Sequence, residues 1–368
     1  MKLGFGCMRL PMIGGPEGQV DQEKFNAMVD AYLASGGRYF DTAHVYLAGQ
    51  SETALREGLV KRYPRESFFL VDKLSGSQFQ SEAEIRPFLE KQMAFCGVDY
   101  FDLYLMHSQS AEVYQKFMSC NAYETAKKLK EEGKIKHWGI SFHDKPAVLE
   151  KILTDWPEIE VVQIQLNYLD YDDPGIEAGG VYEVCERFGK PVLVMEPVRG
   201  GALADLPPEA KKVFEALGGG SPASYALRFA AGFKNVVMVL SGMSDEVQMK
   251  DNIATFQNLK LLNETELAAI RQVREIIRSS NIISCTACRY CVAGCPKKIS
   301  IPDLFSCYNT KKKYQDWGSD FYYDVYTEGR GKASDCIRCG KCEKICPQHL
   351  PIRELLADVA NTFERSEN

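Results

Sequence analysis

Residues 285–296 read CTACRYCVAGCP and residues 336–347 read CIRCGKCEKICP, so one cysteine spacing occurs twice near the end of the chain. In each run three cysteines stand three residues apart, and the fourth follows four residues later, directly before a proline. Three thiolates on one short loop can reach three irons of a cubane cluster, and the fourth iron needs a thiolate from another segment. The spacing predicts two [4Fe–4S] clusters. It does not suit two zinc sites, which take their ligands in pairs, or a disulfide framework.

The two runs also predict which cysteines share a cluster. When two such runs occur together, the last cysteine of each run usually binds the cluster of the other run. The segment resembles a bacterial-type ferredoxin with two clusters, and this resemblance implies electron transfer. The expected ligands of the first cluster are Cys285, Cys288, Cys291 and Cys346. Those of the second cluster are Cys336, Cys339, Cys342 and Cys295.

The bulk composition is that of a soluble globular protein. The chain has 368 residues, 45% of them hydrophobic and 26% charged, with a formal net charge of −6. This charge argues against a nucleic-acid partner or an anionic membrane. The chain lacks an apolar run of the roughly 20 residues that cross a bilayer, and the start MKLGFGCMRLP does not have the features of a signal peptide. Free thiols together with clusters predict a reducing, cytoplasmic location.

Residues 1–262 alternate between short apolar runs and amphipathic stretches, which is the pattern of βα units. The apolar runs are nearly continuous in hydrophobicity, as in strands that are buried on both faces. The expected strands are Leu3–Cys7, Tyr39–Ala43, Phe68–Lys73, Phe101–His107, His137–Ser141, Val161–Asn167, Pro191–Pro197 and Val236–Gly242. Eight strands in alternation with eight helices predict an α/β fold of the TIM (β/α)8 barrel type. A doubly wound open sheet is the alternative, but its glycine-rich G-x-G-x-x-G fingerprint is missing after the first strand.

The chain is expected to fold as three parts. The barrel would take residues 1–262. An amphipathic stretch with Leu267, Ile270, Val273 and Ile277 on one side predicts a linking helix within residues 263–283. Residues 284–368 would form a small, helical, cysteine-rich, ferredoxin-like domain.

Polar side chains follow three consecutive expected strands. Asp41 and Lys73 stand near the ends of the second and third strands, His107 ends the fourth, and Tyr46 lies just beyond Asp41. Active sites of TIM barrels lie at the C-terminal ends of the strands, so these four side chains should converge. A carbonyl that accepts a hydride needs a proton donor, and tyrosine donates readily only when a cation stabilises its phenolate. We expect Tyr46 to be the acid/base, Lys73 and Asp41 to tune it, and His107 to orient the carbonyl.

In these positions the chain resembles the aldo/keto reductase family over residues 1 to about 260. The family's D-T-A-x-x-Y motif, its lysine and its histidine match Asp41, Tyr46, Lys73 and His107, and Glu52 fits the acidic position of the motif. The resemblance implies an oxidoreductase that interconverts a small-molecule carbonyl and the corresponding alcohol.

The resemblance also implies a nicotinamide site with departures from the family pattern. Ser141 and Gln163 match residues that bind the nicotinamide amide, whereas Met195 stands where the family has a stacking tyrosine. Arg199, beside Gly200 and Gly201, is a candidate phosphate ligand.

The nucleotide end of this site shows further departures. Ser241 and Gly242 open the stretch LSGMSDEVQMKDN, in which Asp251 and Asn252 match a pair that contacts adenine. Gly242 and Gln248 replace the family's lysine and arginine for the 2′-phosphate of NADP. Because both cations are missing, NADH is expected over NADPH.

Clusters move one electron at a time, whereas nicotinamides move a hydride. A flavin in the barrel could convert between the two, the clusters could drive a radical reduction directly, or they could be structural. The alternative to an enzyme is an electron-transfer protein whose barrel binds a flavin, a partner or another ligand. Lys297–Lys298 and Lys311–Lys313 are solvated charge runs or a docking site for a ferredoxin or flavodoxin.

Overall fold

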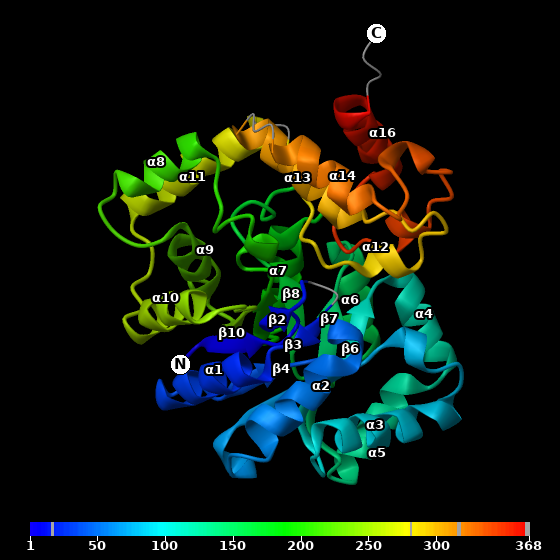
Figure 1. Ribbon diagram of the computed structural model, residues 1–368. Coiled ribbons are helices and arrows are strands. Elements are labelled where there is room, and N and C mark those ends of the chain that lie inside the picture. Colours follow the sequence, from blue (N-terminus) through cyan, green and yellow to red (C-terminus); the bar gives the residue numbers. More distant parts are fainter. Residues whose placement is uncertain (16–17, 280–281, 315–317, 365–368) are drawn as a thin grey trace. The chain divides into compact units, whose positions relative to one another are not determined.

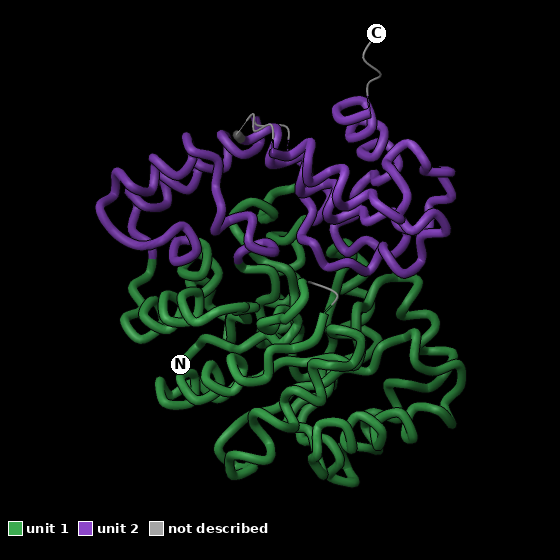
Figure 2. The backbone as a smooth tube through the Cα atoms, in the orientation of Figure 1, with its two compact units in different colours: residues 1–173, 177–197, 226–261 green, residues 174–176, 198–225, 262–368 purple. Residues whose placement is uncertain are grey.

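The computed structural model describes residues 1–15, 18–279, 282–314 and 318–364. The chain forms two compact units, which Figure 2 shows in different colours. The first unit comprises Met1–Asp173, Glu177–Pro197 and Ala226–Leu261. The second comprises Pro174–Ile176, Val198–Tyr225 and Leu262–Asn368.

The first unit is a closed barrel of parallel strands (Figure 1). Around the barrel the strands are β1 (Leu3–Gly6), β4 (Tyr39–Asp41), β5 (Phe69–Leu74), β6 (Phe101–Gln109), β7 (Ile135–Phe142), β8 (Val162–Gln165), β9 (Val192–Met195) and β10 (Val236–Ser241). β10 pairs with β1 and closes the ring. Each strand coincides with one expected strand, so the TIM-barrel prediction is confirmed and the open-sheet alternative is wrong.

The side chains on both faces of the barrel strands are apolar and buried. One set of side chains forms a buried cluster that includes Tyr39, Val71, Leu103, Leu105, Val161, Leu193 and Leu240. The residues between them, such as Phe40, Leu70 and Tyr104, are also fully buried, on the opposite face of each strand from the cluster. Polar residues are therefore confined largely to the strand ends.

The helices of the first unit follow the strands in order. They are α1 (Gln22–Ala34), α2 (Gln50–Leu55), α3 (Glu82–Cys96), α4 (Ala111–Ser119), α5 (Ala122–Glu131), α6 (Pro146–Asp155), α7 (Ala178–Arg187) and α10 (Glu246–Gln257). Asp21 caps α1 by accepting the Lys24 backbone N–H at 3.1 Å, and Asp245 caps α10 in the same way. α9 (Pro222–Ala231) begins in the second unit and ends in the first. The hairpin of β2 (Met12–Ile13) and β3 (Gln19–Val20) was not predicted.

The second unit is helical. Its elements are α8 (Pro208–Glu215), α11 (Glu264–Ser279), α12 (Tyr290–Ala293), α13 (Ile301–Tyr314), α14 (Gly318–Thr327), α15 (Lys341–Lys344) and α16 (Ile352–Phe363). α11 takes the place of the expected linking helix and packs against α8. The compact units thus differ from the expected boundaries, because the insertion that contains α8 groups with the cysteine-rich part.

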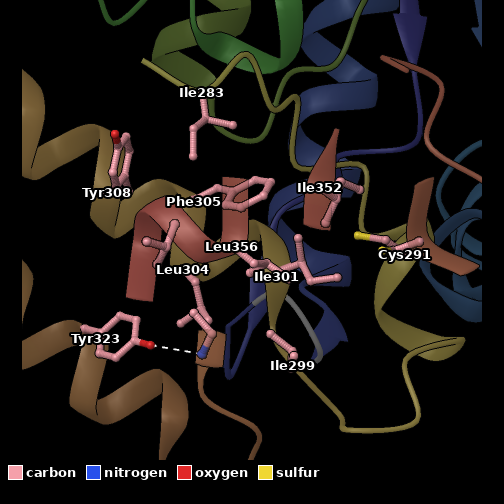
Figure 3. Close-up of a cluster of buried hydrophobic side chains, with 13 residues drawn as sticks. Ile283, Cys291, Ile299, Ile301, Leu304, Phe305, Tyr308, Tyr323, Ile352 and Leu356 are labelled. Atoms are coloured by element: carbon pink, nitrogen blue, oxygen red, sulfur yellow. Dashed lines mark hydrogen bonds between the residues drawn. The ribbon is translucent and has the colours of Figure 1, made fainter. Parts of the chain in front are cut away.

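The core of the second unit surrounds α13 and α16 (Figure 3). Leu304, Phe305 and Leu356 are almost completely buried in it. The Tyr323 hydroxyl accepts the Ala333 backbone N–H at 3.0 Å, and this hydrogen bond ties α14 to the start of the second cysteine run. Among the residues that the structure describes, we find no helix with the length and apolar character that a bilayer span requires.

Gly139 of β7 provides a test of how tightly the barrel is packed. A Cβ atom at this position would lie 2.3 Å from the Val161 carbonyl oxygen, whereas a Cβ atom at Gly219 would have no neighbour within 4 Å. Because a backbone atom cannot easily move aside, Gly139→Ala should lower the free energy of unfolding by about 2 kcal/mol or more. Gly219→Ala should change it little. Equal unfolding midpoints of the two variants would contradict the close contact between β7 and Val161.

Candidate functional site

A buried ion pair joins the ends of β4 and β5. Lys73 Nζ donates to Asp41 Oδ1 at 2.6 Å and to the Thr42 carbonyl oxygen at 2.7 Å. Lys73 is 0% exposed and Asp41 2% exposed. Burial raises the pKa of Asp41, and the Lys73 charge and the Gln163 amide oppose that rise. A buried pair of this kind requires both partners, because either charge alone would be uncompensated.

Tyr46 lies over this ion pair. It opens a tight turn, Tyr46–Gly49, in which Leu47 and Ala48 adopt left-handed conformations with φ of 52° and 55°. The turn places the Tyr46 ring with its centroid 4.8 Å from Lys73 Nζ. Burial raises the pKa of Tyr46 well above its ordinary value, and the nearby Asp41 acts in the same direction. The phenol is therefore neutral and can donate a proton.

His107 completes the group from β6. Its ring centroid lies 6.0 Å from that of Tyr46, with the two rings nearly perpendicular. Burial and the Lys73 charge hold the pKa of His107 well below its ordinary value, so the imidazole is neutral. The Ser75 hydroxyl lies 2.6 Å from His107 Nδ1. Sequence reasoning missed Ser75, although its position directly after β5 was a signal for it.

The predicted nicotinamide residues lie on the next three strands. Ser141 is the second-last residue of β7; it is buried, and its hydroxyl accepts the Ser108 backbone N–H at 2.7 Å. Gln163 of β8 is buried, and its Oε1 has no hydrogen-bond partner among the described residues. Met195 ends β9 and is half-buried. The unsatisfied amide oxygen marks Gln163 as a group that is available for a ligand.

A polar pair and the side chain of Arg9 lie around the end of β10 and the stretch that follows it. Asn252 is buried and donates to the Ser241 hydroxyl at 3.0 Å, while Asp251 beside it is half-buried. The side chain of Arg9 lies against Gly242, because a Cβ atom there would be 3.2 Å from Arg9 Cδ. The Arg9 guanidinium is 3.9 Å from Glu196. Sequence reasoning missed Arg9, which is far from Gly242 in the chain.

Glu52, Asp72 and Cys96 form a second buried group on the other face of β5. One possible ligand atom of each lies within 4.8 Å of the others, which is close enough to hold a metal ion. Burial raises the pKa of Glu52 to about 7 and that of Asp72 well above its ordinary value. Glu52 also contacts His44 Nδ1 at 2.7 Å. The raised pKa values favour a shared proton between these carboxyl groups.

The second unit contains two pockets that are lined by cysteines. Cys285, Cys288, Cys291 and Cys346 line one pocket. Cys295, Cys336, Cys339 and Cys342 line the other. Each pocket thus brings together three cysteines of one run and the last cysteine of the other run. Such four-thiol pockets fit cubane iron–sulfur clusters.

Arg199 lies near the pocket that contains Cys285. It is buried, and its loop groups with the second unit. A Cβ atom at the neighbouring Gly200 would lie 2.4 Å from the Thr286 carbonyl oxygen, so this loop packs directly against the first cysteine run. Burial raises the pKa of Cys285 to about 12, and the Arg199 charge acts in the opposite direction. The structure therefore places Arg199 where it affects a cysteine pocket.

A TIM barrel with an Asp–Tyr–Lys–His group at its strand ends, followed by two four-cysteine pockets, defines an oxidoreductase with an iron–sulfur part. Residues 2–275 match the profile described as the aldo/keto reductase family, and the chain belongs to this family. Residues 284–350 match a 4Fe-4S dicluster domain.

Individual relatives resemble the barrel part of the chain. An aldo-keto reductase of Mycobacterium sp. (strain JLS) is 26% identical over 270 residues, which cover 73% of this chain and 91% of the relative. The mouse aldo-keto reductase family 1 member C13 is 26% identical over 261 residues, which cover 61% and 75%. The crystal structure of a Klebsiella pneumoniae aldo/keto reductase, in complex with NADP and acetate, superposes with a TM-score of 0.61 at 19% identity. That match covers 74% of this chain and 91% of the other, and it shows a common fold.

Removal of the buried Asp41 carboxylate should lower the free energy of unfolding far more than removal of an exposed carboxylate. Asp41→Ala leaves the Lys73 ammonium buried without its carboxylate, which should cost about 3–5 kcal/mol of the free energy of unfolding. Glu57→Ala removes a carboxylate 2.7 Å from Lys61, but those side chains are 47% and 52% exposed. This control should therefore cost less than about 1 kcal/mol. The measurement is denaturant unfolding followed by circular dichroism, and similar losses in both variants would refute the charged, buried Lys73–Asp41 pair.

Proposed function

We propose that the barrel interconverts a small-molecule carbonyl and the corresponding alcohol, with Tyr46 as the acid/base. The observation that carries this proposal is the Lys73 ammonium, which lies 4.8 Å from the Tyr46 ring centroid and is bonded to Asp41. Tyr46 is 9% exposed, so little water competes for its hydroxyl group. The substrate itself is left open by this chemistry.

The proton moves through Tyr46 in this proposal. The neutral phenol donates to the carbonyl oxygen as negative charge develops there. Lys73 stabilises the phenolate that remains, and Asp41 keeps Lys73 charged and in position. If the Ser75 hydroxyl donates to His107 Nδ1, the imidazole proton is on Nε2. His107 can then donate a second hydrogen bond that orients the carbonyl.

A nicotinamide would supply the hydride when bound. We propose that Ser141, Gln163 and Met195 bind its ring end. The proposed contacts at the nucleotide end are Ser241, Gly242, Asp251 and Asn252. NADH is the expected form, because Gly242 and Gln248 carry no charge and Arg9 already lies near Glu196. The NADP complex of the Klebsiella structure supports a nicotinamide in this barrel.

For the second unit we propose two [4Fe–4S] clusters, one in each four-cysteine pocket, that carry single electrons. A ferredoxin or flavodoxin is the proposed electron partner, and a reducing cytoplasm is the proposed location. A second candidate function is a radical-type reduction that the clusters feed directly, with Tyr46 again as the proton donor. The observation in its favour is that Met195, Gly242 and Gln248 replace the stacking tyrosine and the two cations of the family's usual nicotinamide site.

Removal of the Tyr46 hydroxyl tests the acid assignment. Tyr46→Phe should lower carbonyl reduction by about 10²–10⁴-fold, because the developing alkoxide loses its proton donor. Turnover of a panel of small aldehydes and ketones is measured with NADH and, separately, with a chemically reduced one-electron donor. The iron content and the visible absorption should not change.

Tyr39→Phe is the matched control for this variant. Its hydroxyl is buried and has no hydrogen-bond partner among the described residues, so its removal should leave turnover near the wild-type rate. Full activity of Tyr46→Phe would refute the assignment. The absence of reduction by the wild-type protein with either donor would favour a barrel that binds without turnover.

Pairwise cysteine removal tests the crossed ligand sets. The wild type should contain about eight iron and eight sulfide per chain, and Cys342→Ala about four of each. Adding Cys295→Ala should leave about four, since both cysteines line one pocket, whereas adding Cys346→Ala should leave almost none. Cys185→Ala, a buried thiol of α7 outside the pockets, serves as the control and should retain about eight. Equal iron contents of the two double variants would contradict the crossed arrangement.

A further inference from the structure

The two cysteine pockets differ in their access to solvent. Among the residues that line the Cys295–Cys336–Cys339–Cys342 pocket, five are exposed: Pro296, Lys297, Ile337, Cys339 and Lys341. The described residues that line the other pocket are all buried or half-buried, among them Thr286, Pro302 and Phe305. A group bound in the pocket that contains Cys339 would therefore reach the protein surface through this exposed cysteine.

The surface around Cys339 is apolar at its centre and basic at its rim. Ile337 is a large apolar side chain that is 58% exposed. Lys297, Arg338 and Lys341 are exposed beside it, and within the described residues none of the three forms an ion pair. An apolar centre with a polar rim is the usual anatomy of a protein–protein interface.

The local charge is opposite to that of the whole chain. The chain carries a net charge of −6, yet the Cys339 surface presents three cations. Of the nearby acids, Glu343 is bound to the Arg353 guanidinium at 2.7 Å. Asp335 is exposed and accepts the Lys332 backbone N–H at 2.8 Å. Charge complementarity therefore favours an acidic partner.

The other basic run is less suited to this role. Lys311 forms an ion pair with Asp320, and Lys313 lies 3.3 Å from the Asp205 carboxylate. The Lys312 ammonium lies 5.2 Å from the centroid of the Tyr308 ring. Two of the three cations are thus compensated within the second unit, and none of the three lines a cysteine pocket.

We propose that the surface formed by Pro296, Lys297, Ile337, Arg338 and Lys341 is the docking site of a small acidic protein that carries one electron at a time. This inference rests on the proposed presence of a cluster in the Cys339 pocket. On docking, the reduced carrier loses one electron and the cluster gains it, and no covalent bond forms or breaks. The Cys339 pocket is then the entry point, and the more enclosed Cys285 pocket receives electrons second.

Carbodiimide cross-linking locates the contact without depending on turnover. The full-length protein with its iron bound is mixed with a purified, acidic flavodoxin at low ionic strength and treated with the zero-length reagent. Lysine–carboxylate bonds are then mapped by mass spectrometry. We expect the cross-links at Lys297 and Lys341, and their loss at high salt. Cross-links at Lys311–Lys313, at barrel lysines or between two copies of this chain would overturn the proposal.

Charge reversal supplies an independent readout. Arg338→Glu/Lys341→Glu, and separately Lys297→Glu on the other loop, should slow cluster reduction by reduced flavodoxin about tenfold or more at low salt. Lys212→Glu, the same charge change on exposed α8, should have no effect. Reduction by dithionite should be equally fast in all proteins that retain wild-type iron. Wild-type rates with flavodoxin in both surface variants would overturn the docking site, whereas a wild-type protein without iron would instead refute the proposed clusters.

Discussion

The Lys73 ammonium is the charge around which the mouth of the barrel is arranged. It is fully buried, so it depends on Asp41 and the Thr42 carbonyl oxygen for the stabilisation that water would otherwise supply. Its partners come from the end of β4, and β4 and β5 are adjacent in the barrel. The parallel pairing of β4 with β5 therefore brings the two side chains together. The Lys73 charge acts on two further side chains. It faces the ring of Tyr46, and together with burial it lowers the pKa of His107 and keeps the imidazole neutral.

The barrel could be predicted from the sequence because each of its strands is a nearly continuous run of hydrophobic residues. In addition, the barrel strands follow one another around the barrel in the order in which they occur in the chain. The β2–β3 hairpin escaped detection because each strand has two residues, too few for any periodicity. α8 lies in the connection between β9 and α9, where no helix was expected. Asp41, Tyr46, Lys73 and His107 could be found from their places relative to strand ends. Ser75 also follows a strand end and was overlooked, whereas Arg9 could not be found, because its contact with Gly242 is one that no local pattern encodes.

The cysteine pockets show the same division between local spacing and tertiary packing. Each pocket combines three cysteines of one run with the last cysteine of the other run. This grouping could be predicted from the sequence, because the spacing puts three thiols close together and leaves the fourth distant. The unequal exposure of the two pockets could not, because the two runs have identical spacing. It arises from what covers each run: Pro302 and Phe305 of α13 line the Cys285 pocket, whereas Ile337 and Lys341 of the second run leave Cys339 exposed.

The chain passes from the barrel into the cysteine-containing unit shortly after β9. β9 ends at Met195 in the barrel, and within a few residues the chain enters the unit that holds the cysteines. There Gly200 packs against Thr286 so closely that any side chain would collide with backbone, and Arg199 beside it acts on Cys285. Thr286 also lines the enclosed Cys285 pocket, whereas the other pocket is exposed at Cys339. The proposed entry of electrons at the exposed pocket agrees with this difference in exposure, whereas two purely structural clusters would not require the pockets to differ.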